Sequence, residues 1–240
     1  YSYRYEKSTH TTSYQSVSEI KRLFEEPEDE LMVKIDVNQP RNQNRYVEDK
    51  LTRPRFMAEM TAPTSAEIGT ATHLVMQSID LFSPVTLVSV AELITDLVER
   101  GMLQAEVAEK IEGDKVVRFF ENTLGQLLLS HPQQVKREAP FSLLIKADRI
   151  FSDLDPTAQD NVLIHGIIDG YLEYEDEVVL FDYKTDQVDR YGLAAGEKML
   201  EKYKGQMNLY RKALEITLNK PVTQVYLCLL ANNELVLVNE

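Results

Sequence analysis

The chain has 240 residues, of which 43% are apolar and 27% are charged, a composition typical of a globular protein rather than of a disordered or fibrous one. Its formal net charge of -13 argues against a nucleic-acid binder that works through a broad basic face, although acidic side chains can still hold metal ions. The single cysteine, Cys228, excludes a disulfide framework, a zinc ribbon and a cysteine-ligated iron–sulfur cluster, and it favours a reducing, cytoplasmic setting.

The N-terminal part, residues 1–63, is predicted to be an arm, a short helix and an extended wrapping segment. Residues 1–15 are polar, rich in tyrosine and without the apolar core of a secretory signal. A capping box at Ser16-Val-Ser-Glu19 predicts a helix that ends at Phe24. The stretch 25–63 contains four prolines and many charges, so we expect it to be irregular and to wrap another surface.

Residues 64–240 are predicted to be one domain, helical over 64–131 and sheet-containing over 132–240. The box Thr64-Ser-Ala-Glu67 precedes apolar residues at helical spacing up to Phe82, and Ser89-Val-Ala-Glu92 predicts a second helix to Arg100. Further helix over 104–130 is expected to break near Gly113. In the second half, a helix is predicted at 196–218 and strands at 141–151, 162–174, 178–184, 222–230 and 234–238. This order indicates mixed α/β layers.

Two kinds of motif are missing from the sequence. No G-x-x-x-x-G-K-[ST] pattern is present, so this chain alone is not expected to hydrolyse ATP through a P-loop. No apolar run is long enough to span a bilayer, so no membrane partner is expected.

The hairpin of 162–174 and 178–184 is the most informative segment. If its turn is Glu175-Asp176, Asp169 lies opposite Asp182 with Cβ atoms roughly 4.5–5.5 Å apart, and Lys184 shares the face of Asp182. Two carboxylates so close between apolar residues repel each other unless a cation bridges them, and hard oxygen ligands suit Mg²⁺ or Mn²⁺. A neighbouring lysine can meet the anion that the metal attracts, as metal-assisted phosphodiester hydrolysis requires.

The same residues also allow a purely structural interpretation. Asp182 and Lys184 would then lie on the solvated face of an edge hairpin, with Asp169 paired to Lys184. The Glu-Asp turn is a weak hairpin signal, so the register is an assumption.

Four motifs in sequence order resemble those of RecB-type nucleases of the PD-(D/E)XK superfamily: Gly69-Thr-Ala-Thr-His73, Gly166-Ile-Ile-Asp169, Asp182-Tyr-Lys184 and Gln206-Met-Asn-Leu-Tyr210. The flanking stretches 16–22, 53–56, 69–77 and 137–141 are similar to the C-terminal nuclease domain of AddA (RexA) subunits of bacterial helicase–nucleases, so the resemblance covers nearly the whole chain. It implies an α/β, restriction-endonuclease-like core with a mixed central sheet flanked by helices, behind a helical N-terminal half.

The resemblance also implies a metal site that holds Mg²⁺, for which Mn²⁺ can substitute, and no iron–sulfur cluster. Its ligands would be His73, Asp169, Asp182 and the backbone carbonyl of Tyr183, and Lys184 would be the catalytic lysine. Such a site would activate water for attack on phosphorus and stabilise the charge that develops as the 3′ oxygen leaves.

Four more residues are candidates for DNA contact or for support of the site. Lys202, Gln206 and Tyr210 form an i, i+4 row on the helix 196–218, and without the motif this row would be read as a solvated face. Glu138 precedes a strand and would orient the lysine, bind a second metal ion or be an edge charge.

The implied function is a magnesium-dependent exonuclease domain that hydrolyses single-stranded DNA unwound by an attached helicase, in double-strand-break processing for homologous recombination. The implied partners are DNA, N-terminal helicase domains of the same full-length chain and a second subunit of the AddB (RexB) type in a heterodimer. Two alternatives stay open: a catalytically silent nuclease-like scaffold that docks a partner subunit, and a stand-alone RecB-like exonuclease.

Overall fold

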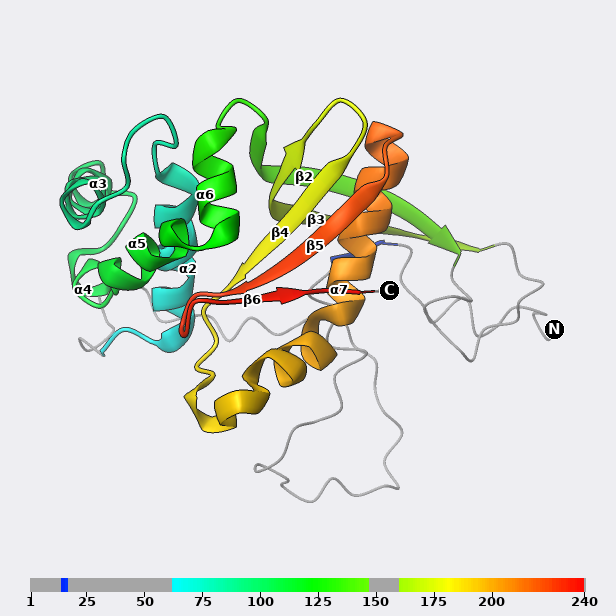
Figure 1. The fold of residues 1–240 in the computed structure, drawn as a ribbon. Coiled ribbons are helices and arrows are strands. Elements are labelled where there is room, and N and C mark those ends of the chain that lie inside the picture. Colours follow the sequence, from blue (N-terminus) through cyan, green and yellow to red (C-terminus); the bar gives the residue numbers. More distant parts are fainter. Residues whose placement is uncertain (1–13, 17–61, 147–159, 240) are drawn as a thin grey trace, which may run out of the picture.

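In the computed structural model, which describes residues 14–16, 62–146 and 160–239, a mixed β-sheet lies between two helical layers (Figure 1). Helices α2 to α6 cover one face of the sheet and helix α7 covers the other. This arrangement confirms the predicted α/β fold, a mixed central sheet flanked by helices. None of the helices in the described ranges is long and apolar enough to cross a membrane.

The first helical layer agrees with the predicted helical half. Its helices are α2 (Ser65–Ser78), α3 (Leu87–Glu99), α4 (Ala105–Ala108), α5 (Gly113–Glu121) and α6 (Thr123–Ser130). Thr64 caps α2 through the predicted capping box. The Glu67 backbone N–H donates to the Thr64 hydroxyl at 3.2 Å, and the Thr64 N–H donates to the Glu67 carboxylate at 2.8 Å.

Three details of this layer differ from the prediction. The cap of α3 is Thr86 rather than Ser89, whose hydroxyl instead accepts from the Thr86 N–H at 2.9 Å. The stretch after residue 104 breaks twice, because Asn122 ends α5 and its side chain caps α6 by accepting from the Gly125 N–H at 2.9 Å. Phe82, expected on the apolar stripe of α2, lies beyond the end of the helix and is 71% exposed.

The described residues contain six strands: β1 (Tyr14–Ser16), β2 (Val135–Lys146), β3 (Asn161–Glu173), β4 (Val178–Lys184), β5 (Val222–Leu229) and β6 (Glu234–Leu237). Their order is β1-β3-β4-β5-β6, with β2 also paired to β3. The pairs β1–β3 and β4–β5 are parallel, and the other pairs are antiparallel. A 3-10 turn (Asp189–Ala194) and helix α7 (Ala195–Leu218) make the crossover from β4 to β5 that a parallel pair requires.

The prediction for the N-terminal residues is wrong where it can be compared. Residues 14–16 form a strand that pairs with β3 from Leu163 to His165, although residues 14–15 were expected in the polar arm and Ser16 as a helix cap. The predicted helix after Ser16 and the wrapping segment up to residue 61 lie outside the described residues. Strand β2 starts at Val135 rather than at residue 141, and the predicted end at 151 also lies outside.

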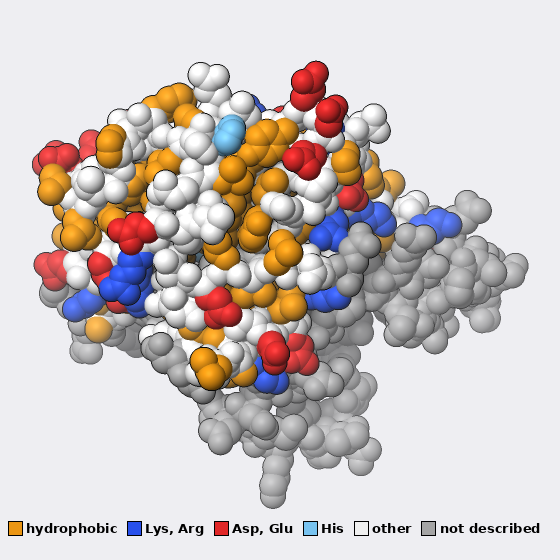
Figure 2. Space-filling model, in the orientation of Figure 1, with side chains coloured by type: hydrophobic (Ala, Val, Ile, Leu, Met, Phe, Trp, Pro, Cys, Tyr) orange, Lys and Arg blue, Asp and Glu red, His pale blue; other side chains and the backbone are white. Residues whose placement is uncertain are grey.

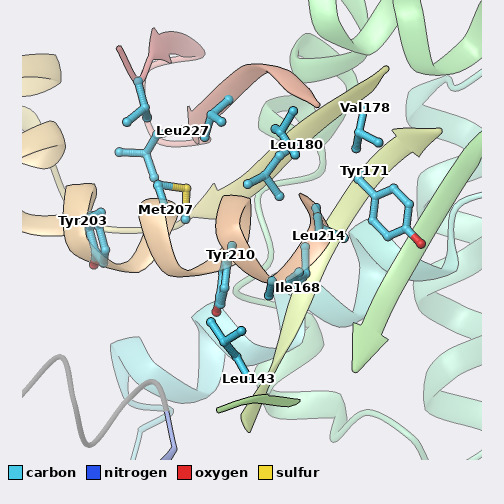
Figure 3. Close-up of a cluster of buried hydrophobic side chains, with 14 of the residues drawn as sticks. Leu143, Ile168, Tyr171, Val178, Leu180, Tyr203, Met207, Tyr210, Leu214 and Leu227 are labelled. Atoms are coloured by element: carbon cyan, nitrogen blue, oxygen red, sulfur yellow. The ribbon is translucent and has the colours of Figure 1, made fainter. Parts of the chain in front are cut away.

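One apolar cluster lies on each face of the sheet. On the face covered by α7, Tyr203, Met207, Tyr210 and Leu214 pack against strand residues that include Leu143, Ile168, Leu180 and Leu227 (Figure 3). Along β4, Val178 and Leu180 belong to this cluster, whereas Val179, Phe181 and Tyr183 pack against the α2–α6 layer. Strand alternation therefore places Asp182 and Lys184 on the α7 face.

Candidate functional site

The hairpin of β3 and β4 has the predicted register. The strands pair from Glu173↔Val178 to Gly170↔Phe181, and the Tyr174 N–H donates to the Glu177 carbonyl at 2.9 Å across the turn. The ladder ends one pair before Asp169 and Asp182. There the Tyr183 N–H donates to the Asp169 carboxylate at 2.8 Å. The two aspartates are thus neighbours, as expected, at the point where the strands separate.

A fork in the sheet produces this separation. Strand β2 occupies one edge of β3 from residue 161 to 172, so β1 and β4 share the other edge. On that edge β1 pairs with 163–165 and β4 with 170–173, so among the described residues 166–169 have no strand partner on this edge, although β2 still runs along the other one. The last residues of β4, 182–184, pair with β5 instead. The candidate residues of both strands therefore border one opening.

His73 reaches this opening from α2. Its Nδ1 lies 3.4 Å from Asp169 Oδ2, and its ring meets the Tyr183 ring edge-on, with centroids 6.2 Å apart. Helix α2 comes close to the end of β4: a Cβ at Gly69 would lie 2.7 Å from Thr185 Oγ1. Burial would lower the pKa of His73, but the hydrogen bond and charge of Asp169, aided by Asp182, raise it.

Asp182 is the one buried charged residue in the part of the chain that the structure describes, at 2% exposure. Burial raises the pKa of Asp182 to about 6 and the charge of Asp169 adds to this effect, while Lys184 and His73 oppose it. Lys184 Nζ lies 2.5 Å from Asp182 Oδ2. Among the described residues, this buried oxygen has no partner apart from the Lys184 ammonium. The interpretation as a solvated hairpin face is therefore wrong.

Glu138 lies on β2, the strand along the other edge of β3, and stands opposite Asp169. The pairs Arg137↔Gly170 and Ala139↔Ile168 flank the two acids, and Glu138 has a left-handed backbone with φ 50°. Burial raises the pKa of the Glu138 carboxyl, and the charge of Asp169 raises it further. Glu138 is therefore part of the acidic opening.

Of the predicted row on α7, Gln206 and Tyr210 form a pair beside the site. Gln206 Nε2 donates to the Tyr210 hydroxyl at 2.7 Å, and the Tyr210 ring packs edge-on against Phe141. Burial raises the pKa of Tyr210, and the charge of Asp182 raises it further. Tyr210 is only 4% exposed, so it is a wall of the site and not a solvated residue.

Lys202 lies behind Lys184 together with Tyr203 and Asp186, two residues that were not predicted as site residues. The Tyr203 hydroxyl donates to both carboxylate oxygens of Asp186, at 2.8 and 3.0 Å, and Lys202 Nζ lies 3.1 Å from Asp186 Oδ1. Lys184 Nζ lies over the Tyr203 ring, 4.4 Å from its centroid. In the sequence Tyr203 fits the apolar stripe of the helix, so no pattern distinguished it from an ordinary core residue.

The donors at the opening suit a hard divalent cation. His73 Nδ1 and the two aspartate carboxylates converge from α2, β3 and β4, and Tyr183, whose carbonyl was predicted as a ligand, has its backbone N–H bound to Asp169. Among the described residues, only the Lys184 ammonium contacts the buried Asp182 Oδ2, so this carboxylate oxygen would be available to a cation that took the place of the lysine. Within the described ranges, no three His, Cys, Asp or Glu side chains are placed so that they could hold a metal ion together, and Lys184 stands where an ion would contact Asp182. The residues fit a cation that displaces this lysine.

Comparison with known proteins identifies the class to which this fold and site belong. Residues 44–237 match the PD-(D/E)XK nuclease superfamily, and the chain therefore belongs to that superfamily. Nucleases of this superfamily generally use divalent metal ions.

Similar proteins within the superfamily confirm the resemblance to AddA subunits that was inferred from the motifs. The chain is 44% identical over 237 residues to the A subunit of the ATP-dependent helicase/nuclease of Enterococcus faecalis. It is 46% identical over 240 residues to the protein of the same name from Pediococcus pentosaceus, and 45% identical to that from Lactiplantibacillus plantarum. These matches cover 96%, 98% and 99% of the chain but only 19% of each relative. The chain thus spans about a fifth of the length of these curated relatives.

Proposed function

We propose that this domain hydrolyses phosphodiester bonds of single-stranded DNA, with Mg²⁺ as its cofactor and Mn²⁺ as a substitute. The observation that carries the proposal is the buried Asp182, which shares the opening with Asp169 and has Lys184 at 2.5 Å. A buried carboxylate is costly to keep unless a cation compensates it, and here that cation is Lys184, whose place at Asp182 a divalent ion can take. Membership of a nuclease superfamily supports phosphodiester bonds as the target.

The proposed roles follow from the positions of the side chains. His73, Asp169, Asp182 and the Tyr183 carbonyl hold the ion, and Mg²⁺ bound there supplies a Lewis acid for the water and the phosphate. Lys184 places its ammonium beside the scissile phosphate, where it stabilises the negative charge of the transition state. The Tyr183 N–H fixes the Asp169 carboxylate at 2.8 Å, so this ligand needs little rearrangement.

Supporting roles go to residues at the rim. Glu138, which faces Asp169, binds a second ion or orients Lys184. Gln206 and Tyr210 brace the wall of the site beside Asp182. Lys202 supplies positive charge for the DNA backbone, although its ammonium lies against Asp186 in this structure.

We further propose that the DNA is delivered to this domain rather than captured by it. On the face seen in Figure 2, acidic and basic side chains are interspersed, and the basic ones do not merge into a broad patch. The net charge of -13 points the same way. Single-strand affinity of the separate domain tighter than about micromolar at physiological salt would contradict delivery.

The proposed source of the single-stranded DNA is the helicase that appears in the name of the relatives. The domain would lie C-terminal to helicase domains of one longer cytoplasmic chain, which pairs with a second subunit of the AddB type. It would degrade unwound single strands during double-strand-break processing for recombination. The name of the relatives, which describes both a helicase and a nuclease, supports this proposal.

The test is nucleotide release from end-labelled single-stranded DNA with Mg²⁺, Mn²⁺ or EDTA. We expect metal-dependent cleavage that Lys184→Ala reduces by at least about a hundredfold. Lys110→Ala is the matched control, because Lys110 is exposed and lies outside the opening. Equal cleavage by both variants would contradict the site assignment. A folded protein that binds metal but never cleaves would favour the silent scaffold or a nuclease that requires its helicase.

A further inference from the structure

Lys184 has a second contact besides Asp182. Its Nζ lies 4.4 Å from the centroid of the Tyr203 ring, well within the range of a cation–π interaction. Tyr203 belongs to α7, is 5% exposed and lies at one end of the row formed with Met207, Tyr210 and Leu214 (Figure 3). The ammonium therefore sits between a carboxylate on β4 and an aromatic face on α7.

The Tyr203 ring is fixed in this orientation at its far end. Its hydroxyl donates to both oxygens of Asp186, at 2.8 and 3.0 Å, just after the end of β4. Lys202 Nζ binds the same carboxylate at 3.1 Å and lies 5.3 Å from the ring centroid. A hydroxyl that donates to an anion makes its ring a better cation acceptor, so the anchor orients the ring and strengthens its attraction for Lys184.

We propose that Tyr203 is the positioning residue of the lysine, and that its ring keeps the Lys184 ammonium at the site when a divalent cation displaces it from Asp182. This role rests on the proposed function. A bound ion needs the Asp182 oxygen that Lys184 now contacts, and it also repels the ammonium. Lysine is flexible, so without another contact it would leave the site. The ring attracts a cation and is no strong metal ligand, so it holds the lysine without competing for the ion.

Two substitutions separate this role from simple packing. Tyr203→Phe keeps the ring and loses only the hydroxyl that binds Asp186. Tyr203→Leu keeps an apolar side chain on α7 but removes the aromatic face. The matched control is Tyr226→Leu, because the partly buried Tyr226 packs on the opposite face of the sheet, with the α2–α6 layer.

The first measurement follows the ε-methylene protons of Lys184 by NMR in the lysine-labelled protein, with Lys184→Arg to assign the signal. Because the ammonium lies over a ring, we expect an upfield ring-current shift that persists at saturating Mg²⁺. Tyr203→Leu should abolish the shift, whereas Tyr203→Phe and Tyr226→Leu should retain it. Movement of the signal to the position of a free lysine when Mg²⁺ binds the wild-type protein would overturn the proposal.

The second measurement separates turnover from binding on single-stranded DNA. We expect Tyr203→Leu to lower kcat about tenfold, with KM and the Mg²⁺ dissociation constant within about twofold of the wild type. Tyr203→Phe should recover most of kcat. A Tyr203→Leu variant that also loses Mg²⁺ binding would show a structural role and overturn the proposal. If the wild-type protein itself binds no Mg²⁺, the proposed function fails first and this role fails with it.

Discussion

Glu138 and Asp169 lie opposite each other at the point where both of their strands change sides. In β2, Val135 packs against the α2–α6 layer, whereas Phe141 and Leu143 pack on the α7 face, although all three positions are odd. In β3, Ile168 faces α7 and Leu172 faces α2–α6, although both are even. The register is the same before and after the two acids, so neither strand gains a residue there.

This reversal explains how one aspartate contacts both helix α2 and the main chain of β4. A residue in regular strand would point to one face only, and Asp169 would then meet either α2 or the α7 face. Instead its carboxylate reaches His73 on α2 and the Tyr183 N–H of β4, next to Asp182 on the α7 face. The left-handed backbone of Glu138 marks the position of the reversal, because a residue other than glycine rarely adopts this conformation.

Gly170, next to Asp169, allows the hairpin to close around the site. A Cβ there would collide with the Phe181 ring and lie 3.1 Å from the Lys136 carbonyl. We therefore expect Gly170→Ala to lower the free energy of unfolding by about 1–3 kcal/mol in urea titrations. Gly205→Ala is the control: a Cβ there meets nothing within 4 Å, and alanine should stabilise α7 by about 0.5–1 kcal/mol. Equal effects of the two changes would contradict the close packing.

Mg²⁺ should stabilise the domain through Asp182. At about a hundredfold excess over its dissociation constant, a ligand that binds only the folded state adds about 2.7 kcal/mol. We expect a rise of this order in the free energy of unfolding of the wild-type protein. Asp182→Asn should lose most of it, whereas Asp176→Asn, an exposed change in the hairpin turn, should keep it. Thermal scans with and without Mg²⁺ measure both, and a full Mg²⁺ response in Asp182→Asn would remove this carboxylate from the site.

The pH dependence of the metal-free protein should carry the signature of the same carboxyl. Its pKa is raised to about 6 in the folded state, from 3.8 in the unfolded chain. Between these values the folded state binds the extra proton, so the contribution of Asp182 to stability is largest below the unfolded pKa. It is lost as the pH rises through 6, by an amount on the order of 2 kcal/mol. The difference in unfolding free energy between the wild type and Asp182→Asn, measured from pH 4 to 7, should change accordingly; a flat difference would contradict the shift.

Sequence reasoning located Asp169, Asp182 and Lys184 correctly relative to one another because alternation and the length of the turn fix strand geometry. The predictions of the capping box at Thr64 and of helix α7 also depended on local sequence patterns, and both are confirmed. The reversal at Glu138 left no signal, since its positive φ occurs at a residue other than glycine. Tyr203 was hidden because a buried aromatic residue looks the same whether it fills the core or contacts a lysine. What escaped prediction depends on long-range contacts.

Arg137 connects the strand that bears Glu138 to the helix that bears His73. Its Nη1 donates to the Ile79 carbonyl at 2.7 Å and to the Met76 carbonyl at 3.3 Å, at the C-terminal end of α2. Arg137→Met leaves these half-buried carbonyls without their donor, so we expect a loss of about 1–3 kcal/mol in unfolding free energy. Faster hydrogen exchange should appear in the last turn of α2.

The control for this connection is Arg118→Met. Arg118 is exposed and pairs with Asp114 within one helix, a contact worth no more than about 0.5 kcal/mol. Because α2 carries His73, Arg137→Met should also weaken Mg²⁺ binding by several fold, whereas Arg118→Met should not. Unchanged exchange in α2 together with unchanged Mg²⁺ affinity would show that packing at Gly69 and Thr185 positions this helix without the arginine.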